Sequence, residues 1–336
     1  MRMFDRRAAL SSAAAGLAYG ASFGIVRAEP IKLKFGNDLP ATHSVNVRLT
    51  AAIQAISDET HGEVQISLFP NNQLGNDKDM ISQLRSGALE LATMPNVTLS
   101  TLVPQTALTG VGYVFTEYDK VWAAIDGEVG AHVRNAIVKA GLQPFETSWD
   151  NGFRQITSST HPIEKPEDLA NFKIRVPVVP LWVAMFTAFG ASPLSVPLAE
   201  AYSALQTKIA DGQENPLSLI ESAKFYEVQK YCSLTNHAWD GFWAIASGKT
   251  WAALSKDVQG VLAKHFNAAA KLQREDNAKA SLDLRKALES RGLAFNTPDA
   301  AAFQAALKKT DFYKKARAKL GDDSWALLQK YAGDIG

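Results

Sequence analysis

One stretch near the C-terminal end of the chain limits the architecture more than any other feature. From Ser255 to Arg291 the apolar residues recur at helical spacing, and no proline interrupts the pattern. Ser255 is a typical N-cap residue with Asp257 in the first turn. A continuous helix of this length would measure on the order of 50 Å at 1.5 Å per residue. Because that is too long for one small domain, we expect the helix to brace two domains.

The length and composition agree with a folded chain of two domains. The 336 residues exceed the size at which a single hydrophobic core usually stops growing. A charged fraction of 21% and seven tryptophans argue against disorder, and a formal charge of +1 gives no sign of a basic nucleic-acid-binding surface. The single cysteine, Cys232, excludes an intramolecular disulfide framework, and we expect it to be a buried small hydrophobe.

Residues 1–28 have the layout of an export signal. The pair Arg6-Arg7 precedes a weakly apolar run rich in Ala, Gly and Ser, and Val26-Arg27-Ala28 fits a signal peptidase. The arginine pair favours the twin-arginine route, whereas a membrane anchor is disfavoured because Gly and Ser break the run. We expect a periplasmic mature chain starting near Glu29. It would carry 31 basic against 33 acidic residues, a net charge of −2.

Strand-like and helix-like segments alternate through the rest of the chain, which predicts an α/β fold built from parallel βαβ units. The pattern restarts after Trp149, and the second block is organised like the first without a sequence repeat. Tyr202, Leu205 and Ile209 are expected on one face of a helix. The predicted strands are 31–35, 64–69, 89–94, 153–158, 172–176, 232–235 and 242–247. The predicted helices are 44–60, 77–86, 181–189, 199–209, 298–308 and 311–331.

The sequence contains no recognisable enzyme signature. It lacks the GxSxG, HExxH, GxGxxG and P-loop motifs, and no two of its six histidines have metal-ligand spacing. Asp240 or His237 could act as a general base on paper. No nucleophile or partner lies near either residue in sequence, so a structural role is the better interpretation. We expect a protein that is not an enzyme and uses no metal or cofactor.

Two arginines lie within apolar strand-like segments: Arg154 in 151–157 and Arg175 in 172–177. A charge near a buried strand end is costly unless it is paired, and the guanidinium fork suits a carboxylate. The residues alone do not decide between a binding site and an internal salt bridge. A third feature is the polar segment 211–216, which predicts a loop with Asn215 held extended before Pro216.

Together these segments resemble the substrate-binding proteins of TRAP transporters, the DctP family, over essentially the whole mature chain. The strings that carry the resemblance are Leu33-Lys-Phe-Gly36, Asn72-Gln-Leu-Gly75, Asn151-Gly-Phe-Arg-Gln-Ile-Thr-Ser158, Lys173-Ile-Arg-Val-Pro177, Gly190-Ala-Ser-Pro193, Ala204-Leu-Gln206, Asp211-Gly-Gln-Glu-Asn-Pro216, Lys224-Phe-Tyr-Glu-Val-Gln229 and Thr235-Asn-His237.

The resemblance implies a two-lobed periplasmic binding protein fold with a long domain-spanning helix. Lobe I would comprise 29–151 plus about 240–272, and lobe II would comprise 152–239 plus about 273–336. Closure of the lobes on a small carboxylate ligand would deliver it to the membrane subunits of a TRAP permease. We expect a monomer with no nucleic-acid partner.

The resemblance also assigns residues to the ligand site. Arg175 would clamp the substrate carboxylate, Arg154 would be a second carboxylate or oxygen contact, and Asn215 would also reach the carboxylate. Asp38 and Asp77 could hold hydroxyl groups. Aromatic walls could come from Trp149, Phe153, Trp182, Trp239 and Trp243, although core packing is the more common role for such residues.

Two departures from relatives that bind sialic acid bear on the substrate. Val178 stands where they have a polar residue, and Pro95 stands where they have a glutamate. We therefore expect a ligand with a less polar body than sialate, such as a small 2-oxo or hydroxy acid, an aromatic acid or a uronate. A periplasmic enzyme on a similar scaffold, or a ligand-binding partner of a membrane sensor, is the alternative.

Overall fold

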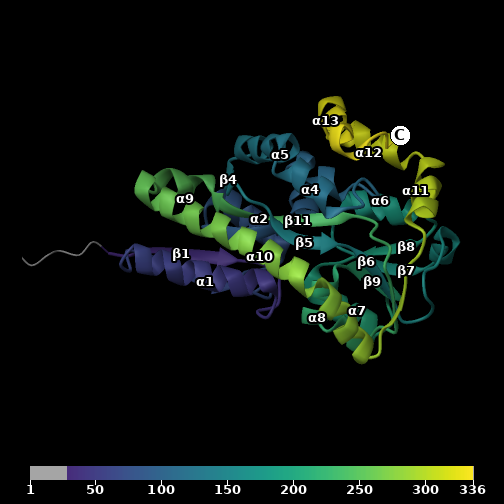
Figure 1. Cartoon of the computed structure of the whole chain (residues 1–336). Coiled ribbons are helices and arrows are strands. Elements are labelled where there is room, and N and C mark those ends of the chain that lie inside the picture. Colours follow the sequence, from purple (N-terminus) through teal and green to yellow (C-terminus); the bar gives the residue numbers. More distant parts are fainter. Residues whose placement is uncertain (1–28, 336) are drawn as a thin grey trace, which may run out of the picture.

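Two mixed sheets of six strands each form the framework of the protein (Figure 1). The structure is a computed structural model that describes residues 29–335, so the expected export signal lies outside the described residues. The first sheet contains β1 (Ile31–Gly36), β2 (Val64–Phe69), β3 (Leu91–Pro95), β4 (Leu142–Pro144), β5 (Trp149–Phe153) and β11 (Trp239–Ser247). The second sheet contains β6 (Gln155–Ser158), β7 (Lys173–Val176), β8 (Ser192–Ser195), β9 (Gly212–Asn215), β10 (Tyr231–Ser233) and β12 (Ala294–Asn296).

The first sheet starts with the predicted parallel βαβ units. β1 pairs in parallel with β2 and β3, and the crossovers are α1 (Ser44–Glu59) and α2 (Asp77–Ser86). Gly87 ends α2 in the left-handed conformation, with φ 84°, as a glycine C-cap does. β11 returns antiparallel to β3 and is buried at every position. The α/β fold is therefore confirmed.

In the second sheet, β9 lies between β6 and β7 and is buried along its whole length. The prediction of a loop at 211–216 was therefore wrong, although Asn215 is extended as expected. The polar strand can be buried because its side chains have partners. Gln213 Nε2 donates to Thr157 Oγ1 at 2.9 Å, and Asn215 Nδ2 donates to Gln213 Oε1.

Two connections cross directly from one sheet to the other. β5 pairs with β11 in the first sheet, and the chain continues after one residue into β6 of the second. The single strand predicted at 153–158 is thus divided at Arg154. The second connection runs from β10 to β11.

The long helix is confirmed as α10 (Lys256–Ser290), and Ser255 caps it by accepting a hydrogen bond from Val258 N. Its first half packs into a core with β1 and α1 through Val258, Leu262 and Phe266. Near its end, Leu288 packs into a separate core with residues of the second sheet's helices. The helix therefore contributes to both cores and lies diagonally across the two sheets (Figure 1).

The remaining helices include two corrections. α7 (Leu198–Gln206) ends before Ile209, whose side chain is 60% exposed, so Ile209 does not extend the apolar face. The helix predicted at 311–331 is two helices, because Gly321, with φ 88° and ψ 151°, leaves the helical conformation. The other α-helices are α3 (Asn96–Leu99), α4 (Tyr118–Ile125), α5 (Glu128–Lys139), α6 (Pro180–Ala188), α8 (Leu217–Ser222), α9 (Gly248–Ala253), α11 (Ala300–Lys308), α12 (Phe312–Leu320) and α13 (Asp322–Ala332).

The C-terminal helices contact both halves of the chain. α12 packs on α6, whereas α13 packs on α4 and α5. The division into lobes at 29–151 plus about 240–272 and 152–239 plus about 273–336 stays a prediction. Cys232 is buried as a free thiol, as expected. Within residues 29–335 none of the helices has both the length and the hydropathy needed to cross a bilayer.

Candidate functional site

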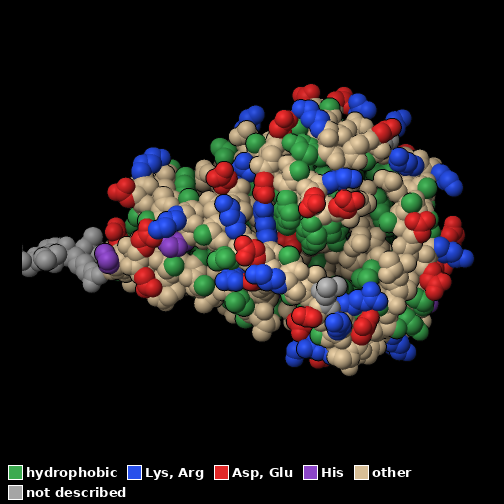
Figure 2. All heavy atoms as spheres, in the orientation of Figure 1, with side chains coloured by type: hydrophobic (Ala, Val, Ile, Leu, Met, Phe, Trp, Pro, Cys, Tyr) green, Lys and Arg blue, Asp and Glu red, His purple; other side chains and the backbone are tan. Residues whose placement is uncertain are grey.

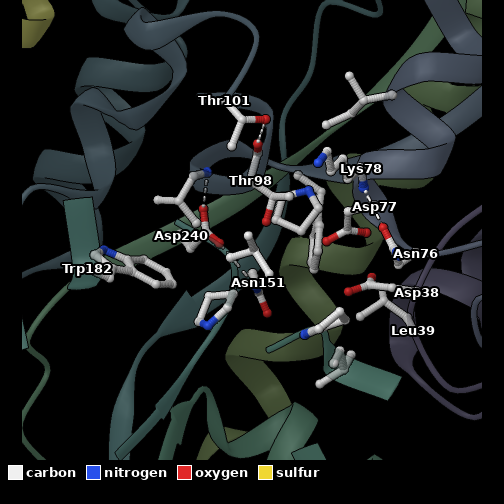
Figure 3. A pocket seen from close by; sticks show the side chains of 18 of the residues that line it. Asp38, Leu39, Asn76, Asp77, Lys78, Thr98, Thr101, Asn151, Trp182 and Asp240 are labelled. Atoms are coloured by element: carbon white, nitrogen blue, oxygen red, sulfur yellow. Dashed lines mark hydrogen bonds between the residues drawn. The ribbon is translucent and has the colours of Figure 1, made fainter. Parts of the chain in front are cut away.

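A cavity of about 500 Å³ opens between the two sheets. Seven of the residues predicted for the ligand site line it (Figure 3). The first sheet and its helices supply Asp38 and Asp77, and the junction between the sheets supplies Arg154. The second sheet, its helices and its loops supply Arg175, Val178, Trp182 and Asn215. Its size is within the range of small-molecule sites.

Arg175, on β7, is a buried guanidinium with a relative exposure of 1%. Its Nε and Nη2 atoms donate to the carbonyl oxygen of Val196 at 3.0 and 2.7 Å. No carboxylate of residues 29–335 lies within ion-pair distance of it. Burial lowers the pKa of Arg175 to about 10. A buried guanidinium without a counter-ion is costly, so this group is ready to accept an anion.

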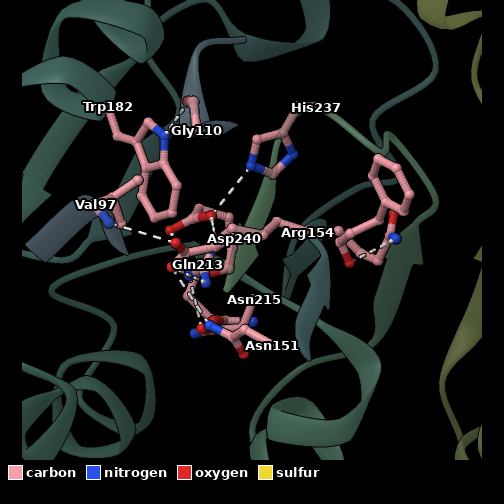
Figure 4. Close-up of polar contacts among 12 residues, drawn as sticks. Val97, Gly110, Asn151, Arg154, Trp182, Gln213, Asn215, His237 and Asp240 are labelled. Atoms are coloured by element: carbon pink, nitrogen blue, oxygen red, sulfur yellow. Dashed lines mark hydrogen bonds and ion pairs between the residues drawn. The ribbon is translucent and has the colours of Figure 1, made fainter. Parts of the chain in front are cut away.

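Arg154, at the junction of β5 and β6, is instead already paired (Figure 4). Its Nε donates to Glu214, and its Nη2 donates to Glu214 Oε1 at 3.0 Å and to Asn215 Oδ1 at 2.7 Å. Nη1 lies 3.9 Å from Asp240 Oδ2. The sequence left a binding role and an internal salt bridge open for this residue. The structure shows the salt bridge at the wall of the cavity.

A second layer of contacts fixes the ion pair of Arg154 and Glu214. His237 Nε2 lies 3.1 Å from Glu214 Oε2, and its Nδ1 lies 2.8 Å from Thr235 Oγ1. Burial raises the pKa of Glu214, but Arg154 and His237 outweigh burial and bring it below its usual value. Glu214 is therefore a carboxylate at neutral pH, and His237 has a structural role, as the sequence analysis favoured.

Trp182, on α6, covers one face of Arg154. The guanidinium carbon lies 4.4 Å from the ring centroid, and Trp182 Nε1 donates to the carbonyl oxygen of Gly110 at 2.8 Å. This stacking suits a planar cation, and it keeps the guanidinium plane fixed at the cavity wall.

Asp38 and Asp77 form an acidic pair on the opposite side of the cavity. Asp38 follows β1, Asp77 is the first residue of α2, and Figure 3 shows the two carboxyl groups directed toward each other. Each has an Oδ1 atom that is buried and has no partner among residues 29–335. Burial raises the pKa of Asp38 to about 6, and burial and the neighbouring Asp38 raise that of Asp77 well above its usual value.

The remaining wall is largely apolar, and Val178 and Pro95 are part of it. Val178 is 43% exposed and borders the entrance. Sequence reasoning did not assign Asn151, Thr98 and Asp240 to the site, although Asn151 and Asp240 lie in or near the arginine and histidine strings. The additional apolar lining residues are Leu39, Ile81, Val97, Leu102, Pro177, Pro180, Pro197, Leu198, Leu219 and Phe242.

Trp149, Phe153, Trp239 and Trp243 do not line the cavity. Trp149 and Trp243 lie in hydrophobic cores and have no exposed surface. The ring of Phe153 packs on Tyr118 at 5.0 Å, and Trp239 Nε1 donates to Asp150 Oδ1 at 2.9 Å. These large rings are thus packed in the interior around the crossing strands, as buried aromatic residues usually are.

The arrangement is suited to binding an anion. One buried guanidinium lacks a counter-ion, and two carboxyl groups in the same cavity can accept or donate hydrogen bonds. Over residues 29–335 no group of three or more His, Cys, Asp or Glu side chains is placed to hold a metal ion.

The chain is similar to bacterial solute-binding proteins. The model of the DctP family, described as bacterial extracellular solute-binding protein, family 7, matches residues 35–318. The solute-binding protein RD1_1052 of Roseobacter denitrificans is 34% identical over 314 residues, covering 92% of this chain and 94% of its own. The 2,3-diketo-L-gulonate-binding periplasmic protein YiaO of Escherichia coli is 32% identical over 276 residues, covering 82% and 84%.

Solved structures give the same result. RD1_1052, a TRAP periplasmic solute-binding protein solved with bound L-galactonate, superposes with a TM-score of 0.83 at 31% identity and covers 90% of this chain and 99% of its own. A TRAP periplasmic solute-binding protein from Sulfurospirillum deleyianum with bound succinate superposes with a TM-score of 0.84 at 28% identity and covers 91% and 99%.

Proposed function

Because the chain belongs to the DctP family of bacterial extracellular solute-binding proteins, we propose that its cavity captures an organic acid for a TRAP-type permease. Its relatives are periplasmic binding proteins rather than enzymes. In this role the protein performs no chemistry on its ligand. It binds one molecule between the lobes, closes around it and releases it to the membrane subunits.

The observation that carries this proposal is the buried Arg175 without a counter-ion. A ligand carboxylate at its free donors would convert a costly buried charge into a charge-assisted pair. The protein's overall field does not supply this attraction. Figure 2 shows basic and acidic side chains interspersed over one face of the molecule, without an extended patch of one sign. Attraction of an anion is therefore local to the cavity.

The acidic pair narrows the ligand class. The unpartnered oxygens of Asp38 and Asp77 need hydrogen-bond partners that can donate to a carboxylate or accept from a carboxylic acid. A hydroxyl group does both, whereas an aromatic acid or a small 2-oxo acid without a hydroxyl group offers no donor. A hydroxy acid of sugar size, such as an aldonate or a uronate, meets this need. The L-galactonate bound to RD1_1052 and the diketogulonate named for YiaO support this choice.

Mass spectrometry of the small molecule released from the purified protein tests the proposal directly. We expect a carboxylic acid recovered chemically unchanged, and aldonates or uronates as the strongest stabilisers in a thermal-shift screen of organic acids. At 100 times the dissociation constant a ligand should stabilise the fold by about 2.7 kcal/mol. Conversion of the released ligand during long incubation would favour a periplasmic enzyme instead. Reconstitution with the membrane partner would distinguish a permease, which transports the ligand, from a sensor, which only binds the ligand-loaded protein.

A further inference from the structure

The buried charges around the cavity do not balance. Two guanidiniums, Arg154 and Arg175, face four carboxyl groups: those of Asp38, Asp77, Glu214 and Asp240. Glu214 forms an ion pair with Arg154, whose Nε and Nη2 donate to the carboxylate. Arg175 therefore has no counter-ion of its own among residues 29–335, and the carboxyl groups of Asp38 and Asp77 line the same cavity from the first sheet's side.

From this juxtaposition we infer that Asp38 and Asp77 make the cavity selective for monocarboxylates with hydroxyl groups and exclude dicarboxylates. The inference rests on the proposed function and concerns the ligand class of the same site. A first carboxylate pairs with Arg175. A second one, at the other end of the ligand, would meet the acidic pair without a cation to compensate it. Like charges brought together in an enclosed site strongly disfavour the wrong ligand.

The other charged groups near the pair do not remove this effect. Lys78 and Arg85 reach the cavity from α2, but both side chains are exposed, so solvent screens them. His43, five residues after Asp38, is buried and its pKa is lowered to about 4 by burial, so it is uncharged at neutral pH. Asp240 faces the pair from β11 and adds to the acidic character of the site.

Hydroxyl groups have the opposite preference. Asp38 is 7% exposed, and its Oδ1 and that of Asp77 lack a partner among residues 29–335. An alcohol can donate to a carboxylate and can accept from a carboxylic acid, so it fits the pair in either protonation state. A second ligand carboxylate can bind only where the pair carries a proton. The exclusion should therefore weaken as the pH falls.

Two pairs of sugar acids isolate the charge of the second end group. Galactonate and galactarate share one configuration, as do gluconate and glucarate, and within each pair the second acid replaces the terminal CH₂OH with a carboxylate. In titration calorimetry at pH 8 the protein is expected to bind the aldonate ~100-fold more tightly than the aldarate. This ratio of affinities corresponds to about 2.7 kcal/mol of like-charge repulsion. At pH 5.5 the preference should fall by ~10-fold.

Asp77→Asn and Asp38→Asn test the residues themselves, because each removes a charge with little change in shape. We expect each variant at pH 8 to reduce the aldonate preference by ~10-fold, mainly through tighter binding of the aldarate. Asp79→Asn is the matched control, since it removes a charge from the same helix at an exposed position outside the cavity lining, and the asparagine oxygen can still accept the capping hydrogen bond from Asn76 N. It should leave the preference unchanged.

Three outcomes would overturn the inference. The first is an aldarate that binds the wild type as tightly as its aldonate. The second is a preference that persists unchanged in both asparagine variants. The third is that none of the four acids binds the wild type or any variant and that the ligand-release experiment yields no carboxylate. This result would also overturn the proposed function. In the first two outcomes carboxylate capture stands and only the selectivity rule fails.

Discussion

Glu214 binds Arg154 through both of its carboxylate oxygens, and neither side chain is more than 4% exposed. The pair lies at the wall of a cavity in which the second arginine, Arg175, has no carboxylate partner among the described residues. The two arginines that look equivalent in sequence thus differ in their availability. Arg154 lines the cavity with its charge paired to Glu214, whereas Arg175 lines it without a counter-ion.

Glu214→Gln should be strongly destabilising. The substitution leaves the Arg154 guanidinium buried without its counter-ion, and breaking a buried pair in this way costs about 3–5 kcal/mol. Urea unfolding of the ligand-free protein measures the loss. Glu128→Gln is the control, because its ion pair with Lys330 is more than 60% exposed on both sides and should contribute less than about 1 kcal/mol. Equal losses in the two variants would contradict the assigned role of the buried pair.

The stability of the ligand-free protein should fall as the pH rises from 6 to 8. Burial raises the pKa of Asp240 to about 7 from an ordinary value of 3.8, so the folded state holds a proton that the unfolded state releases. The stability from this proton is complete below pH 4 and is lost as the pH rises through 7, by about 1.4 kcal/mol between pH 6 and 8. His43 titrates below this window.

Asp240→Asn tests this linkage, because it keeps the size of the side chain and removes the titration. Urea unfolding at a series of pH values should show a flatter profile between pH 6 and 8 for the variant than for the wild type. The stability of the variant relative to the wild type should therefore be higher at pH 8 than at pH 6. A wild-type slope retained in full by the variant would assign the proton to another group, with Asp77 the next to test.

The crossing strand β5 should depend on a glycine. Gly152 has φ 120°, a conformation that L residues rarely adopt, and a Cβ atom there would lie 3.1 Å from Pro216 Cβ. We expect Gly152→Ala to cost about 1–3 kcal/mol in unfolding free energy. Gly260→Ala is the matched control: Gly260 lies within α10 with no atom within 4 Å of the added carbon, so alanine should stabilise by up to about 1 kcal/mol. A tolerated Gly152→Ala would show that the strand relaxes at this position.

Local sequence signals were sufficient for some of the elements whose pattern is periodic. α2 was predicted with its observed bounds, since an N-terminal acidic turn and Gly87 mark its ends, and α10 followed from its unbroken periodicity. β9 could not be predicted in this way. Its residues are polar, and they can be buried only because Arg154 and Thr157, about 60 positions earlier in the chain, satisfy them.

The site was predictable in part for the same reason. The sequence analysis assigned Arg175, Asp38 and Asp77 to the ligand site, and all three line the cavity. Nothing in the sequence showed that Glu214 would form an ion pair with Arg154. The aromatic residues were the least predictable. Trp182 lines the cavity and Trp149 fills a core, and this difference arises from tertiary packing rather than from local pattern.

Titration of sugar acids into the wild type and Arg175→Ala tests the central claim most directly. We expect one molecule of an aldonate or uronate to bind the wild type and affinity to fall by at least about 100-fold in the variant, in which a charged hydrogen-bonding partner is lost. Lys173→Ala, two residues earlier on β7 and exposed, is the control and should bind like the wild type. Thermal unfolding should show that Arg175→Ala is folded, with the stabilisation by ligand lost. An Arg175→Ala protein that the ligand stabilises as much as it stabilises the wild type would contradict the account.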